Sequence, residues 1–162
     1  MGKETPMKCD ANTFSKMYES LYKDLYRFAF YMMKHAQDAE DAVSEAVISA
    51  YENIRKLKNE DAFKSWMFTI LANKCKKKLL SSSGKELPLE HYEARTEQDM
   101  EISMEIKKAF LILTEEERLI VALSVFAGYT SGEIGNMQKI NASTVRSKRK
   151  RALEKMSYVL EA

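Results

Sequence analysis

The densest group of chemically active side chains is a basic stretch near the end of the chain, STVRSKRKRALEKM at residues 143–156. Six cations fall within ten positions, 146–155, and Glu154 is the only acid among them. Arginine can bind guanine through two N–H groups, and lysine neutralises phosphates. A solvated charged face would need acidic partners one helical turn away, which Glu154 alone does not supply. The stretch therefore favours contact with nucleic acid over a solvated tail.

A helix over residues 142–160 would divide this stretch into two faces. We expect the apolar face to enter a core through Val145, Ala152, Leu153, Met156 and Leu160. The residues that then point outward lie mostly in the N-terminal half of the helix, and they are Ser143, Arg146, Ser147, Arg149 and Lys150. A recognition helix enters the major groove with its early residues, so this placement is typical of DNA binding. A helix on a membrane surface would instead need its apolar face to be free.

Two helix starts precede the basic helix. Thr114 with Glu117, and Thr130 with Glu133, have the spacing of a capping box. Gly128 lies between them and can end the first of these helices in a left-handed conformation. The second helix is short and is followed closely by the basic one. Two short helices joined by a tight turn, the second of them basic, predict a helix-turn-helix motif.

The motif also makes steric demands where its two helices cross. Gly135 supplies the small residue that a close crossing requires, and Val145 supplies the apolar side chain that fills it. Lys139 stands where a glycine would relieve a positive φ angle. Either the turn differs from the usual one, or the chain accepts some strain there.

Three amphipathic helix patterns occupy the N-terminal part of the chain. Asn12 or Thr13 can cap the first, whose apolar residues are Phe14, Met17, Tyr18, Leu21, Leu25, Phe28, Ala29 and Met32. Asp38 can cap the second, whose apolar residues are Val43, Ala46, Val47, Ala50, Tyr51, Ile54 and Leu57. The third has apolar residues at Phe63, Trp66, Met67, Ile70 and Leu71, and it ends in Lys74, Lys76, Lys77 and Lys78. A further helix near Met100 would bury Ile102, Ile106, Phe110 and Leu113.

Two groups of charges on these helices have more than one interpretation. The acids of the second helix can simply complement its dipole, and the lysines of the third can stabilise that helix end. The lysines can equally contact a polyanion. The acidic face would repel DNA, so if it is functional it should meet a protein. The residues alone leave these alternatives open.

Composition and cysteine use exclude several classes of protein. The chain has 162 residues, is 45% apolar and has only five glycines and two prolines, which favours a mostly helical fold. Cys9 and Cys75 lie far apart and lack a CxxC pattern, so neither a disulfide framework nor a zinc site is predicted, and a reducing cytoplasm fits. The sequence contains no run long and apolar enough to span a membrane, and its start has no signal-peptide core.

Catalysis is not indicated either. His35 lies in a break between helices and His91 in a polar segment, and the chain has no glycine-rich phosphate loop. The carboxylates cluster on helix surfaces and do not converge from separate elements. We therefore predict that the protein is not an enzyme and uses no cofactor or metal.

The charge distribution suggests how the chain is organised. Residues 1–80 carry 14 basic and 11 acidic groups, residues 81–117 carry 4 and 10, and residues 118–162 carry 8 and 3. The segment 81–99, SSSGKELPLEHYEARTEQD, has no helical periodicity and reads as an acidic linker. We predict an all-α protein with a helical domain at residues 1–80, of which 1–11 are expected to be disordered, and a helix-turn-helix domain at residues 100–162, joined by this flexible linker.

Taken in order, four motifs resemble a bacterial sigma-70 family factor of the extracytoplasmic-function (ECF) group. LYRFAFYMMKHAQDAEDAVSEAVISAYENI and FKSWMFTILANKCKKKL are similar to region 2, and LTEEERLIVALSVFAGYTSGEI and STVRSKRKRA are similar to region 4. The resemblance runs from about residue 14 to residue 157. It implies a cytoplasmic transcription initiation factor that binds core RNA polymerase, recognises the −10 and −35 elements of promoter DNA, and is open to control by an anti-sigma factor.

The resemblance also implies roles for individual residues. Contacts to core polymerase would come from Glu40, Asp41, Ser44 and Glu45. Contacts to the −10 element would come from Asn59, Phe63, Lys64, Trp66, Asn73, Lys76 and Lys77. Contacts to the −35 element would come from Ser143, Thr144, Arg146, Ser147, Arg149, Lys150 and Arg151. The competing hypotheses are a stand-alone helix-turn-helix regulator, which binds DNA without polymerase, and a module that binds only proteins.

Overall fold

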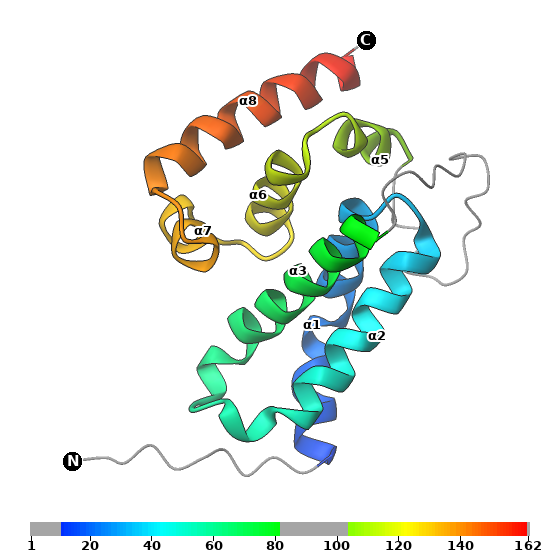
Figure 1. Ribbon diagram of the computed structural model, residues 1–162, viewed down its shortest axis with the longest axis vertical. Coiled ribbons are helices and arrows are strands. Elements are labelled where there is room, and N and C mark those ends of the chain that lie inside the picture. The colour runs from blue at the N-terminus through cyan, green and yellow to red at the C-terminus, as the bar shows by residue number, and fades with distance from the viewer. Residues whose placement is uncertain (1–10, 82–103, 162) are drawn as a thin grey trace.

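The computed structural model describes residues 11–81 and 104–161. Within these residues the chain is helical and contains no strand, so the all-α prediction is confirmed (Figure 1). The N-terminal half consists of α1 (Ala11–Met32), α2 (Ala36–Glu52), the 3-10 turns η1 (Ile54–Lys56) and η2 (Glu60–Ala62), and α3 (Phe63–Ser81). The C-terminal half consists of α5 (Met104–Leu111), α6 (Glu115–Val125), α7 (Ser131–Gln138) and α8 (Ala142–Glu161).

The helices α1, α2 and α3 lie side by side and form a bundle (Figure 1). Their shared core takes Leu25 and Phe28 from α1, Ala46 from α2, and Met67 and Leu71 from α3, all of which are fully buried. The small side chains of α2 let that helix approach its neighbours closely. Burying each large apolar side chain contributes about 1.5–3 kcal/mol to the free energy of unfolding. This core is therefore the main source of stability in the N-terminal half.

Two helix starts differ from the predicted ones. The first helix already includes Ala11, so Asn12 and Thr13 lie inside it and do not cap it. The second begins at Ala36 with His35 at the N-cap position, and Asp38 lies in its first turn, where a carboxylate complements the helix dipole. Ala11, the last residue of the segment expected to be disordered, is helical. Residues 1–10 of that segment lie outside the described residues.

In the C-terminal half the predicted caps are present. The Thr114 hydroxyl accepts the Glu117 N–H at 3.2 Å, and the Glu117 carboxylate accepts the Thr114 N–H at 3.0 Å. Thr130 and Glu133 form the same pair of bonds at 3.2 and 3.0 Å. Gly128 has the predicted left-handed conformation, with φ at 74°.

Four apolar residues that were predicted to face a core are exposed: Tyr51, Ile106, Leu153 and Leu160. Tyr51 still packs its ring edge-on against Phe14, with ring centroids 5.3 Å apart. On α5 the buried position next to Ile106 belongs to Lys107, which is only 2% exposed. Helical spacing places a residue on a face, but the neighbouring helices decide how wide the buried part of that face is.

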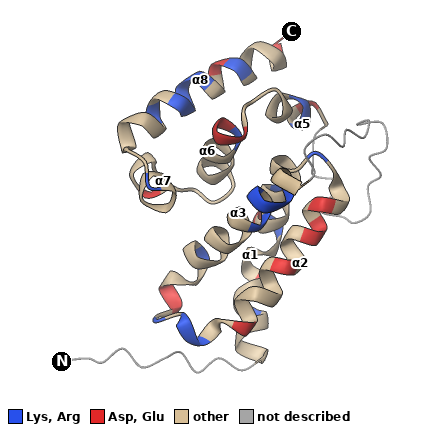
Figure 2. Ribbon diagram, viewed as in Figure 1, with Lys and Arg blue, Asp and Glu red and all other residues tan. Residues whose placement is uncertain are grey.

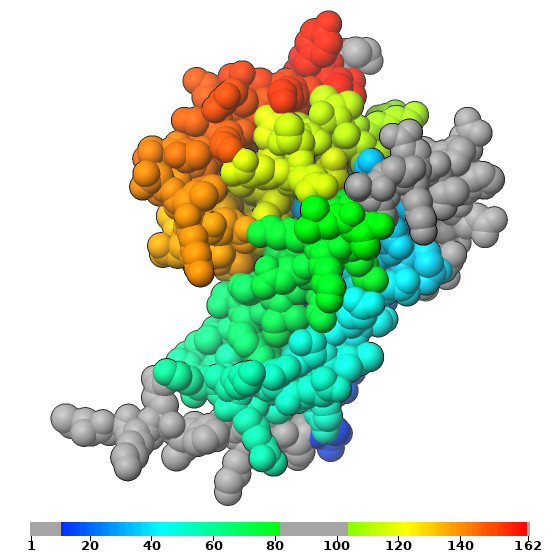
Figure 3. Space-filling view, in the orientation of Figure 1, coloured from blue at the N-terminus to red at the C-terminus, as the bar shows by residue number. Residues whose placement is uncertain are grey.

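The C-terminal half packs against α1 through α5 and α6. It also contacts α3, and yellow and green atoms meet there in the space-filling view (Figure 3). The Tyr31 ring lies 5.0 Å from that of Phe110 and 5.1 Å from that of Phe126. This packing explains why Tyr31 and Met33 are buried although they lie off the predicted apolar face of α1. Of the expected linker, Ser81 belongs to α3, and residues 82–99 lie outside the described residues.

Candidate nucleic-acid and polymerase interfaces

The helix-turn-helix motif is formed by α7 and α8. A Cβ atom on Gly135 would lie 2.6 Å from the Ile140 carbonyl oxygen, so only glycine fits where the helices cross. Val145 is fully buried at the same crossing. Lys139 has φ 58° and ψ 44°, so the chain accepts a left-handed lysine in the turn. The turn is further held by a 3.0 Å bond from the Ile140 N–H to the Gly135 carbonyl.

The second and third turns of α8 carry its cluster of basic residues, drawn in blue on the ribbon in Figure 2. Of the residues expected to contact the −35 element, Arg149 is half-buried, and the exposed ones are Ser143, Thr144, Arg146, Ser147, Lys150 and Arg151. The structure thus brings this set together on one helix. The Ser147 hydroxyl donates to the Ser143 carbonyl at 3.1 Å, which leaves its oxygen able to accept another bond.

Two other cations of α8 point back toward α6. Lys148 pairs with Glu116, and Lys155 pairs with Glu117 at 2.9 Å. Burial acts to raise the pKa of Glu117, but the hydrogen bonds from Thr114 and Lys155 outweigh it and lower the pKa. Lys148 and Lys155 thus help to hold α8 against α6, and the other cations of α8 are not part of these two ion pairs.

The residues expected to contact the −10 element form two groups along α3. Near its start, the Asn59 side chain accepts the Asp61 N–H at 2.6 Å, Lys64 is exposed, and Trp66 is half-buried against Phe63. Phe63 itself is 4% exposed and lies edge-on to Phe14, so its ring supports this end of α3 from inside.

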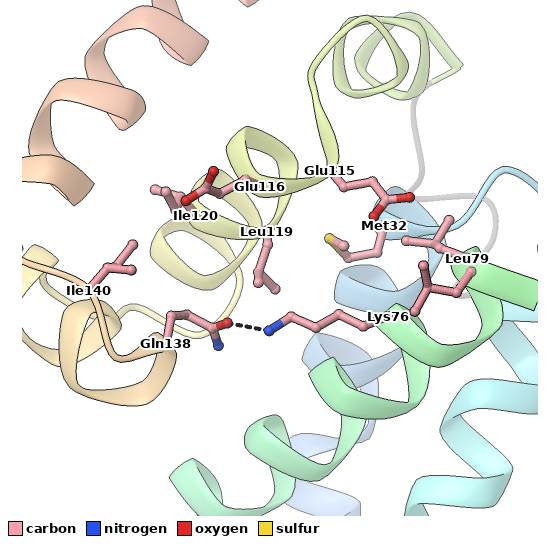
Figure 4. A pocket seen from close by; sticks show the side chains of 10 residues that line it. Met32, Lys76, Leu79, Glu115, Glu116, Leu119, Ile120, Gln138 and Ile140 are labelled. Atoms are coloured by element: carbon pink, nitrogen blue, oxygen red, sulfur yellow. Dashed lines mark hydrogen bonds between the residues drawn. The ribbon is translucent and has the colours of Figure 1, made fainter. Parts of the chain in front are cut away.

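The second group lies about 15 Å further along the helix axis, given a rise of about 1.5 Å per residue. Asn73 and Lys77 are exposed there. Lys76 is half-buried, and its ammonium donates to the Gln138 side chain of α7 (Figure 4). In this arrangement one cation of α3 is already engaged by the C-terminal half.

The residues expected to bind core polymerase lie on one side of α2, where the acids are drawn in red in Figure 2. Glu40 and Asp41 are half-buried, and Ser44 and Glu45 are exposed. The Glu45 carboxylate also pairs with Lys78 of α3 at 3.0 Å.

Beside these acids, α2 exposes apolar side chains that the sequence interpretation did not assign to a site. Ile48 is 58% exposed, and it continues the row of Asp41 and Glu45 at helical spacing. Apolar groups within a charged rim are typical of a surface that binds another protein.

Two buried cations were not predicted at all. Lys107 donates to the Phe30 and Met33 carbonyls at the end of α1. The Arg118 guanidinium donates to the Met32 carbonyl at 2.9 Å, and to carbonyls of its own half at Phe110 and Leu113, both at 3.1 Å. The carbonyls at a helix end lack partners within the helix, and these two cations satisfy them for α1. The only signal in the sequence was that α1 ends without a basic residue of its own.

Burial lowers the pKa of Lys107 to about 7, and the charge of Arg118 acts in the same direction. Burial also lowers the pKa of Arg118. An arginine remains charged even so, since its ordinary pKa is above about 12.

A groove of about 420 Å³ lies between the two halves (Figure 4). Its lining is mainly apolar, with Leu79, Leu80 and Leu119 among its residues, and it carries Lys76 and two glutamates at its edges. Within residues 11–81 and 104–161, no three His, Cys, Asp or Glu side chains gather as a metal site would require. None of the helices in those ranges combines the length and apolar character needed to cross a membrane.

A helix-turn-helix unit with a basic recognition helix, packed on a helical bundle with an acidic face, defines a class of DNA-binding protein that also meets a protein partner. Residues 17–84 match the family Sigma-70 region 2, and residues 109–157 match Sigma-70, region 4. Together the two matches cover more than two thirds of the 162 residues. The chain belongs to the sigma-70 family of RNA polymerase sigma factors.

Individual relatives agree with this assignment. The ECF RNA polymerase sigma factor SigM of Mycobacterium tuberculosis is 26% identical over 155 residues, which cover 93% of this chain and 79% of SigM. The RNA polymerase sigma factor SigV of Bacillus subtilis is 25% identical over 144 residues, which cover 85% of each chain. The protein is a transcription initiation factor of the ECF group that directs RNA polymerase to promoters, and it is not an enzyme.

Two solved structures share the fold. The sigma factor RpoE from Bartonella quintana, in complex with the anti-sigma factor NepR, superimposes with a TM-score of 0.72 at 19% identity and covers 94% of this chain and 99% of its own. CnrH, in complex with the cytosolic domain of CnrY, gives a TM-score of 0.66 at 18% identity, with 94% and 90% covered. A stand-alone regulator would not need the region 2 half, so the initiation factor is favoured over that alternative.

Proposed function

We propose that this sigma factor divides promoter recognition between its two halves. In this proposal α8 reads the −35 element through Ser143, Thr144, Arg146, Ser147, Arg149, Lys150 and Arg151. The α3 helix and the turn before it bind the −10 element through Asn59, Phe63, Lys64, Trp66, Asn73, Lys76 and Lys77, with Phe63 acting from inside as support. The observation that carries the proposal is the exposed basic surface in the N-terminal half of α8, opposite the buried Val145.

The same proposal assigns the acidic face of α2 to core polymerase. Glu40, Asp41, Ser44 and Glu45 would make the polar contacts, and the exposed Ile48 would supply apolar contact area beside them. The proposed domains are residues 1–81, because Ser81 ends α3, and residues 100–162, with the residues between them as the proposed linker. The protein works in the cytoplasm, because that is where RNA polymerase acts.

Run-off transcription with purified core polymerase on genomic DNA fragments tests the proposal. We expect transcripts that start at a defined set of promoters and that require both core polymerase and this chain. DNA binding should weaken steeply with salt, because phosphate contacts release counterions. A salt-independent interaction and no defined starts would instead indicate a module that binds only proteins.

A second partner is an anti-sigma factor, because the structural neighbour RpoE was solved with one. The groove between the halves, with Leu80 exposed along it, offers an apolar surface for such a partner. We expect Leu80→Asp to raise promoter activity in cells and to leave transcription with purified components unchanged. Equal activity of the variant and the unchanged protein in cells would contradict an anti-sigma factor at this groove.

A further inference from the structure

The turn between α7 and α8 contains a lysine in a conformation that favours glycine. Lys139 has φ 58° and ψ 44°, and among the described residues it is the only one other than glycine with a positive φ. A residue with a Cβ atom is strained in this left-handed conformation, because the Cβ atom crowds the following carbonyl oxygen. In the turn between α6 and α7 the left-handed residue is Gly128, with φ 74°. The chain thus uses glycine in one of these turns and lysine in the other.

No contact within the described residues compensates for the strain at Lys139. Its side chain is exposed, and within residues 11–81 and 104–161 its ammonium forms neither a hydrogen bond nor an ion pair. Its backbone N–H bonds to the Gly135 carbonyl, a bond that a glycine would make equally well. The adjacent Gln138 accepts from Lys76, which brings a second positive charge to this end of α7. A residue held in a strained conformation without a structural reason is a candidate for a functional one.

The position of Lys139 suits a contact with the DNA backbone. In a helix-turn-helix protein the second helix enters the major groove and the first helix crosses the backbone. Lys139 directly follows α7 and lies three residues before Ala142, where α8 begins (Figure 1). The surface proposed to bind the −35 element starts at Ser143, immediately beyond this turn. A lysine here can neutralise a phosphate beside the groove that α8 enters.

The exposed side of α7 is compatible with a phosphate close to Lys139. Gly132 and Asn136 precede Lys139 on this side at helical spacing, and neither carries a charge. The other exposed residue of α7 is Glu133, whose carboxylate accepts the Thr130 N–H at 3.0 Å. Glu133 lies six residues before Lys139, which corresponds to about 9 Å along a helix. The acid of α7 is therefore at the other end of the helix from Lys139.

Resting on the proposed function, we infer that Lys139 binds a phosphate of the DNA backbone beside the −35 element. The need for its charge accounts for a lysine where a glycine would relax the turn. Because the phosphate is the same in every sequence, this contact positions α8 in the groove and does not read bases. The −35 interface then includes the turn before α8 as well as α8 itself.

Lys139→Gly and Lys139→Asn test the inference in the full chain assembled with core polymerase. Both new residues adopt the left-handed conformation readily, and neither is charged. We expect each variant to bind promoter DNA roughly five- to ten-fold more weakly at about 0.1 M salt. The slope of log affinity against log salt concentration should fall in magnitude by about 0.9, the value for one phosphate. The loss of affinity should be the same for every −35 sequence.

Chemical denaturation of the same variants should show a change in the opposite direction. Lys139→Gly should raise the equilibrium constant for folding about five-fold or more, because the turn is no longer strained. Weaker DNA binding by a more stable protein cannot be attributed to misfolding. Lys139→Arg keeps the charge and should keep the affinity and the salt slope. Lys108→Asn removes an exposed lysine of α5, outside the motif, and should also leave both unchanged.

DNA with single neutral linkages identifies the phosphate itself. Methylphosphonates are placed one at a time around the −35 element, and the affinity of each holoenzyme is measured. We expect at least one position at which the substitution weakens binding by the unchanged protein and has no further effect on Lys139→Asn. Two groups in direct contact give such non-additive losses, whereas independent groups give additive ones.

An unaltered affinity and salt slope in Lys139→Asn would overturn the inference. Losses that add fully at every methylphosphonate position would overturn it as well. Failure of the proposed function looks different, since the unchanged holoenzyme would then bind equally well to promoters with and without the −35 element.

Discussion

At the scale of single residues, Arg146 is the side chain on which sequence readout most directly depends. It is exposed in the second turn of α8, beside Ser143 and Ser147. If it binds a base edge, Arg146→Ala should cost about 1–3 kcal/mol and relax selectivity at one promoter position. The measurement is the affinity of holoenzyme for promoters substituted at each −35 position.

The matched control is Lys155→Ala, which removes a cation of the same helix that is paired with Glu117. We expect that variant to bind promoters almost as the unchanged protein does. Uniform weakening of Arg146→Ala across all sequences would instead show that Arg146 contacts a phosphate.

Gly135 allows a second prediction at this scale. An alanine Cβ would be forced to within 2.6 Å of the Ile140 oxygen, whereas at Gly132 the nearest atom, the Thr130 hydroxyl oxygen, is 3.9 Å away. Gly135→Ala should therefore destabilise the fold by about 1–3 kcal/mol through overpacking. Gly132→Ala should instead stabilise it by about 0.5–1 kcal/mol, because glycine costs more entropy within a helix.

Chemical denaturation of both variants measures these differences in the free energy of unfolding. A Gly135→Ala protein as stable as Gly132→Ala would mean that α7 and α8 can move apart, and that the tight crossing is not required.

At the scale of elements, α2 combines acidic and apolar groups on one exposed face. Reversing the charge in Glu40→Lys with Glu45→Lys should weaken the binding of core polymerase, since charge complementarity at an interface contributes most to association rate and specificity. The measurement is the association rate and affinity for core polymerase, with Glu19→Lys on the exposed part of α1 as the control.

We expect the control to bind core polymerase normally and the double variant to associate more slowly, with the difference shrinking at high salt. Unchanged binding of the double variant would reject α2 as the polymerase surface. It would leave the acids with the role of complementing the helix dipole.

At the scale of the whole molecule, Lys107 links the contact between the halves to pH. Its pKa is lowered to about 7 in the folded chain, first by burial and then by Arg118, from an ordinary value of 10.5. The unfolded chain therefore holds a proton there that the folded chain releases. Stability should rise as pH increases above about 7, because the unfolded state binds more protons in that range.

Unfolding free energies measured between about pH 6.5 and 8.5 test this effect. The rise in stability with pH should be absent in Lys107→Met, which keeps the length of the side chain and its apolar stem but has no titratable group. Burial raises the pKa of the Cys75 thiol from 9.0 to about 12. Above pH 9 the unfolded chain loses this proton and the folded chain keeps it, so stability falls with pH there. The pH range of the measurement therefore ends below 9. The same pH slope in both proteins would show that Lys107 does not titrate there.

Much of this protein follows from the sequence alone. The capping boxes at Thr114 and Thr130, the left-handed Gly128 and the basic outer face of α8 are all as predicted. These features depend on residues within one or two helical turns of each other, so helical periodicity and capping rules are sufficient to predict them.

The tertiary structure alone decided which side chains the two halves bury between them. Lys107 and Arg118 look like surface cations in the sequence, and Leu153 resembles a core residue, yet the cations are buried and the leucine is exposed. The carbonyls that Lys107 and Arg118 bind are at residues 30, 32 and 33, more than 70 positions away in the chain. Burial depends on which distant helix covers a surface, and the local spacing of apolar residues does not predict which helix that is.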